Sequence, residues 1–231
     1  YDQLAEIVGP EFVSDAPEEK YIYAMDPGTM PPCEPDYVVM PGSTEEVQKI
    51  LRAANEHRVP VVPLGAGLVL SGLSRALRGG IVLDMKRMNR VVEINQMSRY
   101  ALVEAGTSQG MLQAYLKKHC PDLKHSAPDA PPAATIAGNV SIHGSGHMSH
   151  AGGFHSDMLN GLEVVLPTGE VMRTGSASHL EGDFFWGEGP GPDLWGMFKG
   201  TAGVLGGAGM CTRIGIKLHA WPGPKRFPCE G

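Results

Sequence analysis

The amino-acid sequence predicts a mixed α+β fold, on three observations. Residues 36–85 read as strand, helix and strand, which predicts a small α/β lobe with a parallel pair. Residues 90–106 and 157–175 each read as two strands joined by a short turn, the pattern of antiparallel hairpins. The chain holds 31 glycines, an excess that clusters at 65–80, 138–161 and 187–215, and clusters beside good strands suggest a ligand cradle. A length of 231 residues suits one large domain or two small lobes.

Composition excludes several classes of function. The net charge is −6 and there is no basic run, so nucleic acid is not an expected partner. No apolar stretch approaches a membrane span, and the first residues do not form a signal peptide. The four cysteines lie far apart with no CxxC, which argues against an iron–sulfur or zinc site within the chain and suits a reducing cytoplasm. Because the sequence starts at Tyr1 and not at a methionine, a fragment is one expectation.

The first third of the chain is patterned from its start. Residues 3–8 predict a short helix, and residues 21–35 read as an irregular crossing segment. Strands are expected at 36–41, 59–64 and 80–85. Between the first two, a helix begins after Ser43 or Thr44 and ends near His57, and its apolar residues recur at helical spacing.

A glycine-rich turn follows the second of these strands, with the sequence PLGAGLVLSGL at residues 63–73. Successive backbone N–H groups in such a turn suit a diphosphate. Any tight turn can carry Gly-x-Gly, so an ordinary strand-to-loop turn is the alternative.

The segment at residues 126–157 is rich in Gly, Pro and Ala and has no apolar run long enough for a core helix or strand. It is either a surface loop or backbone laid against a ligand. It also holds four histidines, His143, His147, His150 and His155. No carboxylate or thiol stands at ligand-like spacing from them, so no metal site is expected.

The remaining elements complete the pattern. Residues 107–116 predict a capped amphipathic helix, and residues 193–200 a short helix. Glycines then lead into an apolar run at residues 210–218.

Several motifs, in order, carry a resemblance to a known family. ATIAGNV at 134–140, DMLNGLEVVLPTGEVMRTG at 157–175 and GMCTRIGIKL at 209–218 resemble signatures of the flavoproteins related to vanillyl-alcohol oxidase and para-cresol methylhydroxylase (PCMH). The turn at 63–73 resembles the family's pyrophosphate loop, RGxGTxLSGG, but Leu64, Leu68 and Leu73 replace its Arg, Thr and last Gly. The resemblance covers residues 36–224, and the segments YIYAMD at 21–26 and PDYVVMPGSTEEVQKIL at 35–51 look most like the glycolate oxidase and D-lactate dehydrogenase branch.

The resemblance implies a two-lobed PCMH-type FAD-binding domain with the flavin between the lobes. After the N-terminal helix and crossing segment at 1–35, it implies a first lobe at 36–122 with short parallel strands. A second lobe follows at 123–224 with an antiparallel sheet. Residues 225–231 would begin the linker to a substrate-binding cap domain that this chain does not contain.

The resemblance also implies FAD as the cofactor. Some relatives attach the flavin through a histidine of the pyrophosphate loop, but residues 63–73 contain none, so we expect non-covalent FAD. Attachment by His143 or His147 is a minor alternative. The expected cofactor-binding residues are Pro63, Leu64, Gly65, Ala66, Gly67, Leu68, Val69, Ser71, Ala105, Gly106, Thr107, Pro128, Asp129, Thr135, Ile136, Gly138, Asn139, Ser141, His143, Gly209, Met210 and Cys211.

The function implied is an FAD-dependent dehydrogenase that oxidises a small 2-hydroxy acid such as D-lactate or glycolate. Hydride transfer to the flavin would be followed by electron transfer to a partner, an iron–sulfur or other acceptor subunit. The alternatives are oxidation of a para-hydroxybenzylic alcohol or alkylphenol, and a non-catalytic flavin subunit of a larger electron-transfer complex. No catalytic residue is assigned, because the family places most of them in the cap domain.

Overall fold

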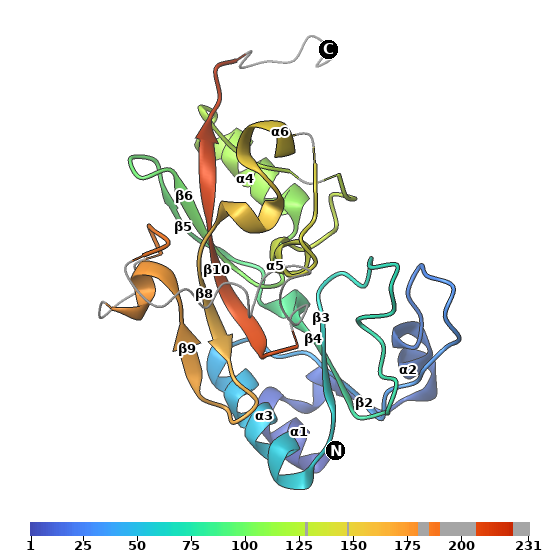
Figure 1. Ribbon diagram of the computed structural model, residues 1–231. Coiled ribbons are helices and arrows are strands. Elements are labelled where there is room, and N and C mark those ends of the chain that lie inside the picture. The colour runs from blue at the N-terminus through green and yellow to red at the C-terminus, as the bar shows by residue number, and fades with distance from the viewer. Residues whose placement is uncertain (128, 147, 180–184, 190–206, 224–231) are drawn as a thin grey trace.

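The computed structural model describes residues 1–127, 129–146, 148–179, 185–189 and 207–223 (Figure 1). Within these residues two β-sheets share one apolar core, and helices cover both. The expected α+β class is therefore confirmed. Pro128, His147, the helix expected at 193–200 and the linker expected from 225 fall outside the described residues.

The first sheet has the strand order β1-β2-β4-β3. Its strands are β1 (Val13–Ser14), β2 (Tyr37–Val39), β3 (Val61–Leu64) and β4 (Ile81–Asp84). Both β2 and β3 pair with β4 in parallel, which confirms the expected parallel strands, and β1 adds an antiparallel edge. The helices of this part are α1 (Asp2–Val8), η1 (Pro10–Phe12), α2 (Pro17–Tyr23), α3 (Thr44–His57) and η2 (Met85–Arg87).

Helix α3 forms where the sequence predicts it. The Ser43 hydroxyl accepts a hydrogen bond from the backbone N–H of Glu46 at 3.2 Å, and this cap fixes the first turn. The helix stops at Arg58, which adopts a left-handed conformation with φ 57°. Its apolar face is buried in the core.

The second sheet has six antiparallel strands in the order β5-β6-β10-β8-β9, with β7 also paired to β10. The strands are β5 (Val91–Asn95), β6 (Tyr100–Glu104), β7 (Leu123–His125), β8 (Leu159–Val165), β9 (Val171–Arg173) and β10 (Met210–Ala220). Both expected hairpins are present. The long β10 lies between β6 and β8, so it holds together strands that are far apart in sequence.

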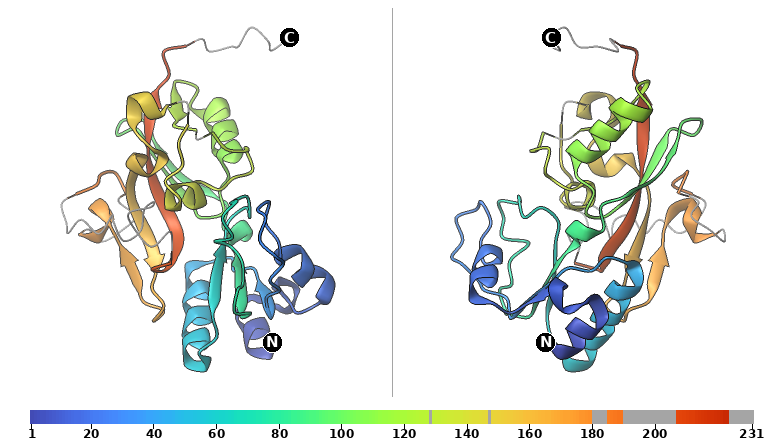
Figure 2. Two further views of the ribbon diagram at one scale, coloured as in Figure 1. Left: turned by 45° about the vertical axis from the view of Figure 1, so that its right-hand side comes forward. Right: turned by 180° about the vertical axis from the view of Figure 1, so that it is seen from behind.

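The hairpin of β5 and β6 joins the second sheet, although both strands precede residue 123. The strands before residue 90 belong to the first sheet and those after it belong to the second, because β6 pairs with β10 along residues 100–104. The helices beside this sheet are α4 (Gln109–His119), α5 (Ile136–Ser141), α6 (Ser149–Gly152), η3 (His155–Met158) and η4 (Gly175–Ser178). Figure 2 shows α4, α5 and α6 gathered on one side of β10 and β8.

The segment at 126–157 differs from the sequence-based expectation of no core helix. Helix α5 forms there because the Thr135 hydroxyl accepts a hydrogen bond from the N–H of Gly138 at 3.2 Å. Ile136 and Val140 bury completely against the core, so two apolar side chains suffice for a helix this short.

Glu163 joins helix α3 to the second sheet at one buried point. This β8 carboxylate accepts hydrogen bonds from Thr44 at the start of α3 and from Thr212 on β10, each at 2.9 Å. Arg173 on β9 adds an ion pair at 2.8 Å. Because three elements donate to one carboxylate, its burial is compensated. No helix in the described part of the chain is long and apolar enough to cross a membrane.

Candidate functional site

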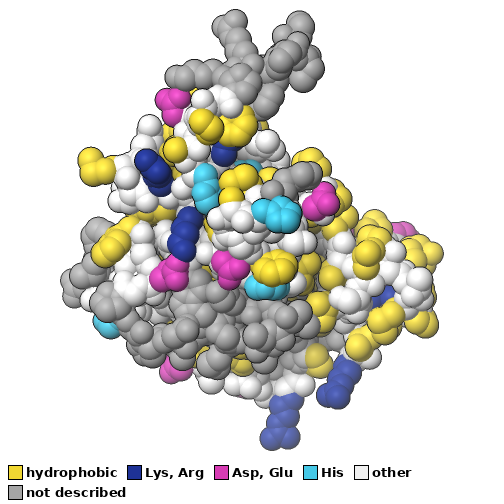
Figure 3. All heavy atoms as spheres, turned by 45° about the horizontal axis from the view of Figure 1, so that its top comes forward, with side chains coloured by type: hydrophobic (Ala, Val, Ile, Leu, Met, Phe, Trp, Pro, Cys, Tyr) yellow, Lys and Arg dark blue, Asp and Glu magenta, His cyan; other side chains and the backbone are white. Residues whose placement is uncertain are grey.

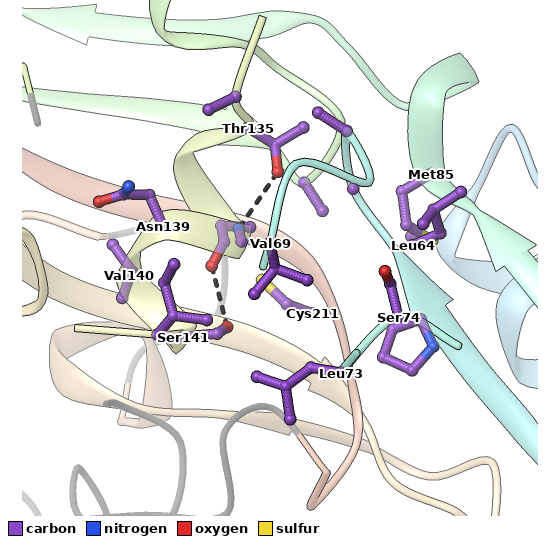
Figure 4. Close-up of a pocket in the computed structure, with 18 of the residues that line it drawn as sticks. Leu64, Val69, Leu73, Ser74, Met85, Thr135, Asn139, Val140, Ser141 and Cys211 are labelled. Carbon is purple, nitrogen blue, oxygen red and sulfur yellow. Dashed lines mark hydrogen bonds between the residues drawn. The ribbon is translucent and has the colours of Figure 1, made fainter. Parts of the chain in front are cut away.

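An open cleft with a volume of about 200 Å³ lies where the two sheets meet. Three walls form it: the loop that follows β3, helix α5, and the ends of β8 and β10 (Figure 4). The residues that line it are Pro63, Leu64, Gly65, Ala66, Gly67, Leu68, Val69, Leu73, Ser74, Met85, Ala105, Ala130, Pro131, Ala134, Thr135, Ala137, Gly138, Asn139, Val140, Ser141, Ile142, Leu162, Val164, Gly209, Met210 and Cys211. None of these side chains is charged, so the cleft suits a largely apolar ligand held by a few polar groups.

The loop after β3 offers a row of free backbone donors. Within the part of the chain that the structure describes, the N–H groups of residues 66–71 have no hydrogen-bond acceptor. Gly67 turns this loop with φ 66°, a conformation that side chains disfavour. Such a row of unpaired amides is suited to the oxygens of an anionic ligand.

Gly65 brings the same loop against helix α5. A Cβ atom at Gly65 would lie 2.3 Å from the Thr135 hydroxyl oxygen, so no larger residue fits without movement. Thr135 itself is held by the cap of α5, and the Ser141 hydroxyl donates to the carbonyl of Ala137 at 2.9 Å. The hydroxyls of Thr135 and Ser141 therefore each make one hydrogen bond within α5.

The third wall is the start of β10 against β8. Gly209 approaches β8 so closely that a Cβ would lie 2.6 Å from Val164 Cγ1. Next to it, burial raises the pKa of the Cys211 thiol to about 12, and the Glu163 carboxylate adds to the shift. The thiol is neutral at physiological pH, and a neutral thiol is a poor nucleophile.

Most of the residues predicted to bind a cofactor do line the cleft. They are Pro63, Leu64, Gly65, Ala66, Gly67, Leu68, Val69, Ala105, Thr135, Gly138, Asn139, Ser141, Gly209, Met210 and Cys211. The structure thus brings together four parts of the chain, at 63–69, 105, 135–141 and 209–211, that are separated by up to 148 positions in sequence (63 to 211).

The other predicted residues lie around the cleft, not on its wall. Ile136 and Thr107 are fully buried, and the backbone carbonyl of Thr107 accepts from the N–H of Ile136 at 3.0 Å. Gly106 packs against the turn after β4, where a Cβ would lie 2.1 Å from the Met85 carbonyl. Ser71 and Asp129 are exposed at the surface.

His143 is engaged outside the cleft. Its Nδ1 shares a hydrogen bond with the Ser156 hydroxyl, and its ring stacks on Phe154 with 4.2 Å between centroids. Its backbone has φ 58°, which is uncommon for a residue with a side chain. Among the described residues no group of three or more His, Cys, Asp or Glu side chains is arranged to hold a metal ion.

Two further histidines are buried behind α5. His155 Nδ1 lies 3.0 Å from Asn139 Oδ1, and His125 Nε2 lies 3.0 Å from Gln109 Oε1. An amide oxygen only accepts, so each of these ring nitrogens carries a proton. Burial lowers the pKa of His155 to about 3 and that of His125 to about 4, and both rings are therefore neutral at pH 7.

Sequence reasoning missed part of the lining, namely Leu73, Ser74, Met85, Ala130, Pro131, Ala134, Ala137, Val140, Ile142, Leu162 and Val164. A signal existed for some of them. Leu162 and Val164 alternate along a strand, which places both side chains on one face. Met85 ends a parallel strand beside β3, so it reaches the same sheet edge as the loop at 65–71.

Exposed hydrophobic side chains flank the mouth of the cleft. Leu68, Leu70 and Leu73 come from the loop after β3, and Met25 and Met30 from the segment before β2. Figure 3 shows hydrophobic side chains gathered on this part of the molecule, at the right of the view.

Comparison with known proteins identifies a family. The family model described as "FAD binding domain" matches residues 35–175. The chain is 34% identical over 229 residues to glycolate oxidase subunit GlcD of Bacillus subtilis (strain 168), covering 97% of this chain and 46% of that protein. It is 34% identical to the mitochondrial cytochrome-type D-lactate dehydrogenase of Arabidopsis thaliana, covering 81% of this chain and 31% of that protein. It is 33% identical to the flavoprotein subunit of 4-cresol dehydrogenase of Pseudomonas putida, covering 81% and 36%.

Solved structures agree with the sequence relatives. A structure of p-cresol methylhydroxylase with substrate bound superposes with a TM-score of 0.85 at 28% identity, covering 96% of this chain and 43% of that one. A 4-ethylphenol oxidase from Gulosibacter chungangensis gives 0.83 at 32% identity, covering 96% and 42%. The chain spans less than half the length of these relatives. It belongs to the family of FAD-binding domains found in the flavoproteins related to p-cresol methylhydroxylase.

Proposed function

We propose that this chain is the FAD-binding part of a flavin-dependent dehydrogenase that oxidises a small 2-hydroxy acid of the D-lactate or glycolate class. The observation that carries the proposal is the uncharged cleft, which has a row of free backbone N–H groups along one wall. The sequence similarity to a glycolate oxidase subunit and a D-lactate dehydrogenase supports the choice of substrate class.

The residues of the cleft fit FAD. The N–H groups of residues 66–69 would receive the diphosphate oxygens, and Gly65 and Gly67 leave room for close approach of the backbone. Leu162, Val164 and Met210 offer an apolar surface to the rings. When bound, FAD supplies the acceptor for the hydride that leaves the substrate carbon.

This chain's own residues bind and orient the cofactor and exclude water from one side of it. Among the described residues, the lining holds no cation that would receive a substrate carboxylate and no group that would serve as a base. We therefore propose that substrate-binding and catalytic groups belong to a cap domain following residue 225. We also propose the division into lobes at 36–122 and 123–224, with the β5–β6 hairpin of the first lobe reaching across to complete the sheet of the second.

The cofactor is held without a covalent bond, and its electrons go to an acceptor subunit that carries an iron–sulfur or other redox centre. The first part is supported by the absence of histidine from residues 63–73 and by the neutral Cys211 thiol. The second is supported by similarity to relatives named as subunits. The widely spaced cysteines support a cytoplasmic location.

A second candidate is oxidation of a para-hydroxybenzylic alcohol or an alkylphenol. The observation in its favour is the superposition on p-cresol methylhydroxylase with a TM-score of 0.85. A flavin subunit that only transfers electrons is the alternative outside catalysis.

Anaerobic mixing of substrates with the flavoprotein that includes the proposed cap domain separates these functions. Bleaching of the flavin absorbance by D-lactate or glycolate, and not by p-cresol, is the expected result. Bleaching by p-cresol alone would favour the second candidate, and no bleaching by either class would favour the carrier. Acid precipitation should release the flavin into the supernatant, whereas flavin that stays in the pellet would contradict non-covalent binding.

A further inference from the structure

We propose that the Ser74 hydroxyl makes a hydrogen bond to the FAD bound in the cleft, although the motif of the pyrophosphate loop ends before this residue. The inference rests on the proposed function, because its ligand is FAD. It adds one side-chain contact to a site otherwise built from backbone amides and apolar surface.

The first observation is the state of the polar side chains that line the cleft. The Thr135 hydroxyl caps α5, Ser141 donates to Ala137, and Asn139 accepts from His155. The Cys211 thiol lies 3.5 Å from the carbonyl of Arg213. Ser74 also lines the cleft, and within the described residues its hydroxyl has no hydrogen-bond partner. Among the hydroxyls of the lining, Ser74 is therefore the one that makes no hydrogen bond within the described residues.

The second observation is the position of Ser74 across the cleft from α5. Figure 4 shows its side chain on the loop side, near Leu64 and Leu73, whereas Thr135 and Ser141 stand on the opposite wall. A ligand between the two walls would meet the engaged hydroxyls of α5 on one side and the free hydroxyl of Ser74 on the other.

The third observation is that the next residue fixes the backbone at this point. Arg75 is only 3% exposed and donates to the carbonyl of Met30 at 2.7 Å and to that of Ala24 at 2.9 Å. It also hydrogen bonds to the carbonyl of Pro31 and lies 3.9 Å from the carboxylate of Asp26. A neighbour held by several partners presents the Ser74 hydroxyl in one place, so little entropy is lost when the ligand binds.

The competing position in the same loop is Ser71, which the family's LSG motif indicates. The structure places Ser71 at the surface and outside the lining. The sequence motif therefore favours Ser71 as the serine that contacts FAD, whereas the structure favours Ser74.

The test is an equilibrium titration of cofactor-free protein with FAD, followed by flavin fluorescence. Ser74→Ala should raise the Kd about three- to tenfold, the range expected for loss of one neutral hydrogen bond. Ser71→Ala should change it less than twofold. Ser98→Ala, an exposed serine on the turn between β5 and β6, is the neutral control. Ser74→Thr keeps the hydroxyl and should retain more affinity than Ser74→Ala.

Unfolding temperatures of all variants separate binding from stability. Ser74→Ala should unfold at the wild-type temperature without FAD, because its hydroxyl has no partner within the protein. An unchanged Kd for Ser74→Ala, or a larger loss for Ser71→Ala, would overturn the inference and leave the proposed function intact. If the folded wild-type protein binds no FAD, both are overturned.

Discussion

At the scale of single residues, Gly65 sets how closely the loop after β3 approaches helix α5. The Cβ of an alanine would lie 2.3 Å from the Thr135 hydroxyl oxygen, a separation far below contact distance. The Thr135 hydroxyl cannot move away without losing the hydrogen bond that it accepts from the N–H of Gly138, which caps α5. At Gly67 the nearest atom to an added Cβ is 3.5 Å away, so the cost there comes from the positive φ alone.

Gly65→Ala should therefore destabilise the protein by about 1–3 kcal/mol, the usual cost of overpacking, and should also weaken FAD binding. Urea unfolding and flavin titration measure the two effects. In a Thr135→Ala background the clash is absent, so the cost of Gly65→Ala should shrink. Equal costs in both backgrounds would show that the contact with Thr135 is not the cause.

At the scale of elements, two neutral histidines hold the segments behind the cleft. His155 on η3 donates to Asn139 on α5, and the backbone carbonyl of Gly144 accepts from the His155 N–H at 2.8 Å. His125 on β7 contacts Gln109 on α4 in the same way. These bonds fix the wall formed by α5, and burial keeps both rings uncharged inside the protein.

The consequence is a loss of stability in mild acid. The pKa of each ring is lowered on folding, to about 3 for His155 and about 4 for His125, so the unfolded chain takes up protons first as the pH falls below about 6.5. The free energy of unfolding should therefore fall with pH between about 6.5 and 4, by up to about 1.4 kcal/mol per pH unit for each ring.

Urea unfolding between pH 7.5 and pH 5 tests this. His155→Asn keeps a donor for Asn139 and removes the titrating ring, so its stability should depend less steeply on pH than that of the wild type. The same slope in both proteins would mean that His155 does not titrate on unfolding.

At the scale of the whole molecule, local patterns and ordered motifs predicted the three parallel strands of the first sheet, helices α3 and α4, both hairpins and most of the cleft lining. Those features depend on periodicity, caps and turns that lie within a few residues. The place of β10 between β6 and β8 could not be read in this way, because it depends on pairing between residues about 110 positions apart, as for Glu104 and Arg213.

In the cleft, too, some residues could be predicted from local motifs and others only from the folded structure. Glycine motifs identified the loop at 65–71, but only the folded chain shows that Ser74 faces the cleft and Ser71 faces solvent. Helix α5 was missed because its sequence is rich in small residues, and its stability comes from the Thr135 cap and from burial of Ile136 and Val140.

The central claim is that FAD occupies the cleft between the two sheets. The most direct measurement is a titration of the cofactor-free protein with FAD, with binding followed by flavin fluorescence and folding by circular dichroism. The account predicts saturation at one FAD per chain and a higher unfolding temperature with the cofactor. A protein that is folded, shows the expected mixture of helix and strand, and neither binds FAD nor gains stability from it would contradict the account.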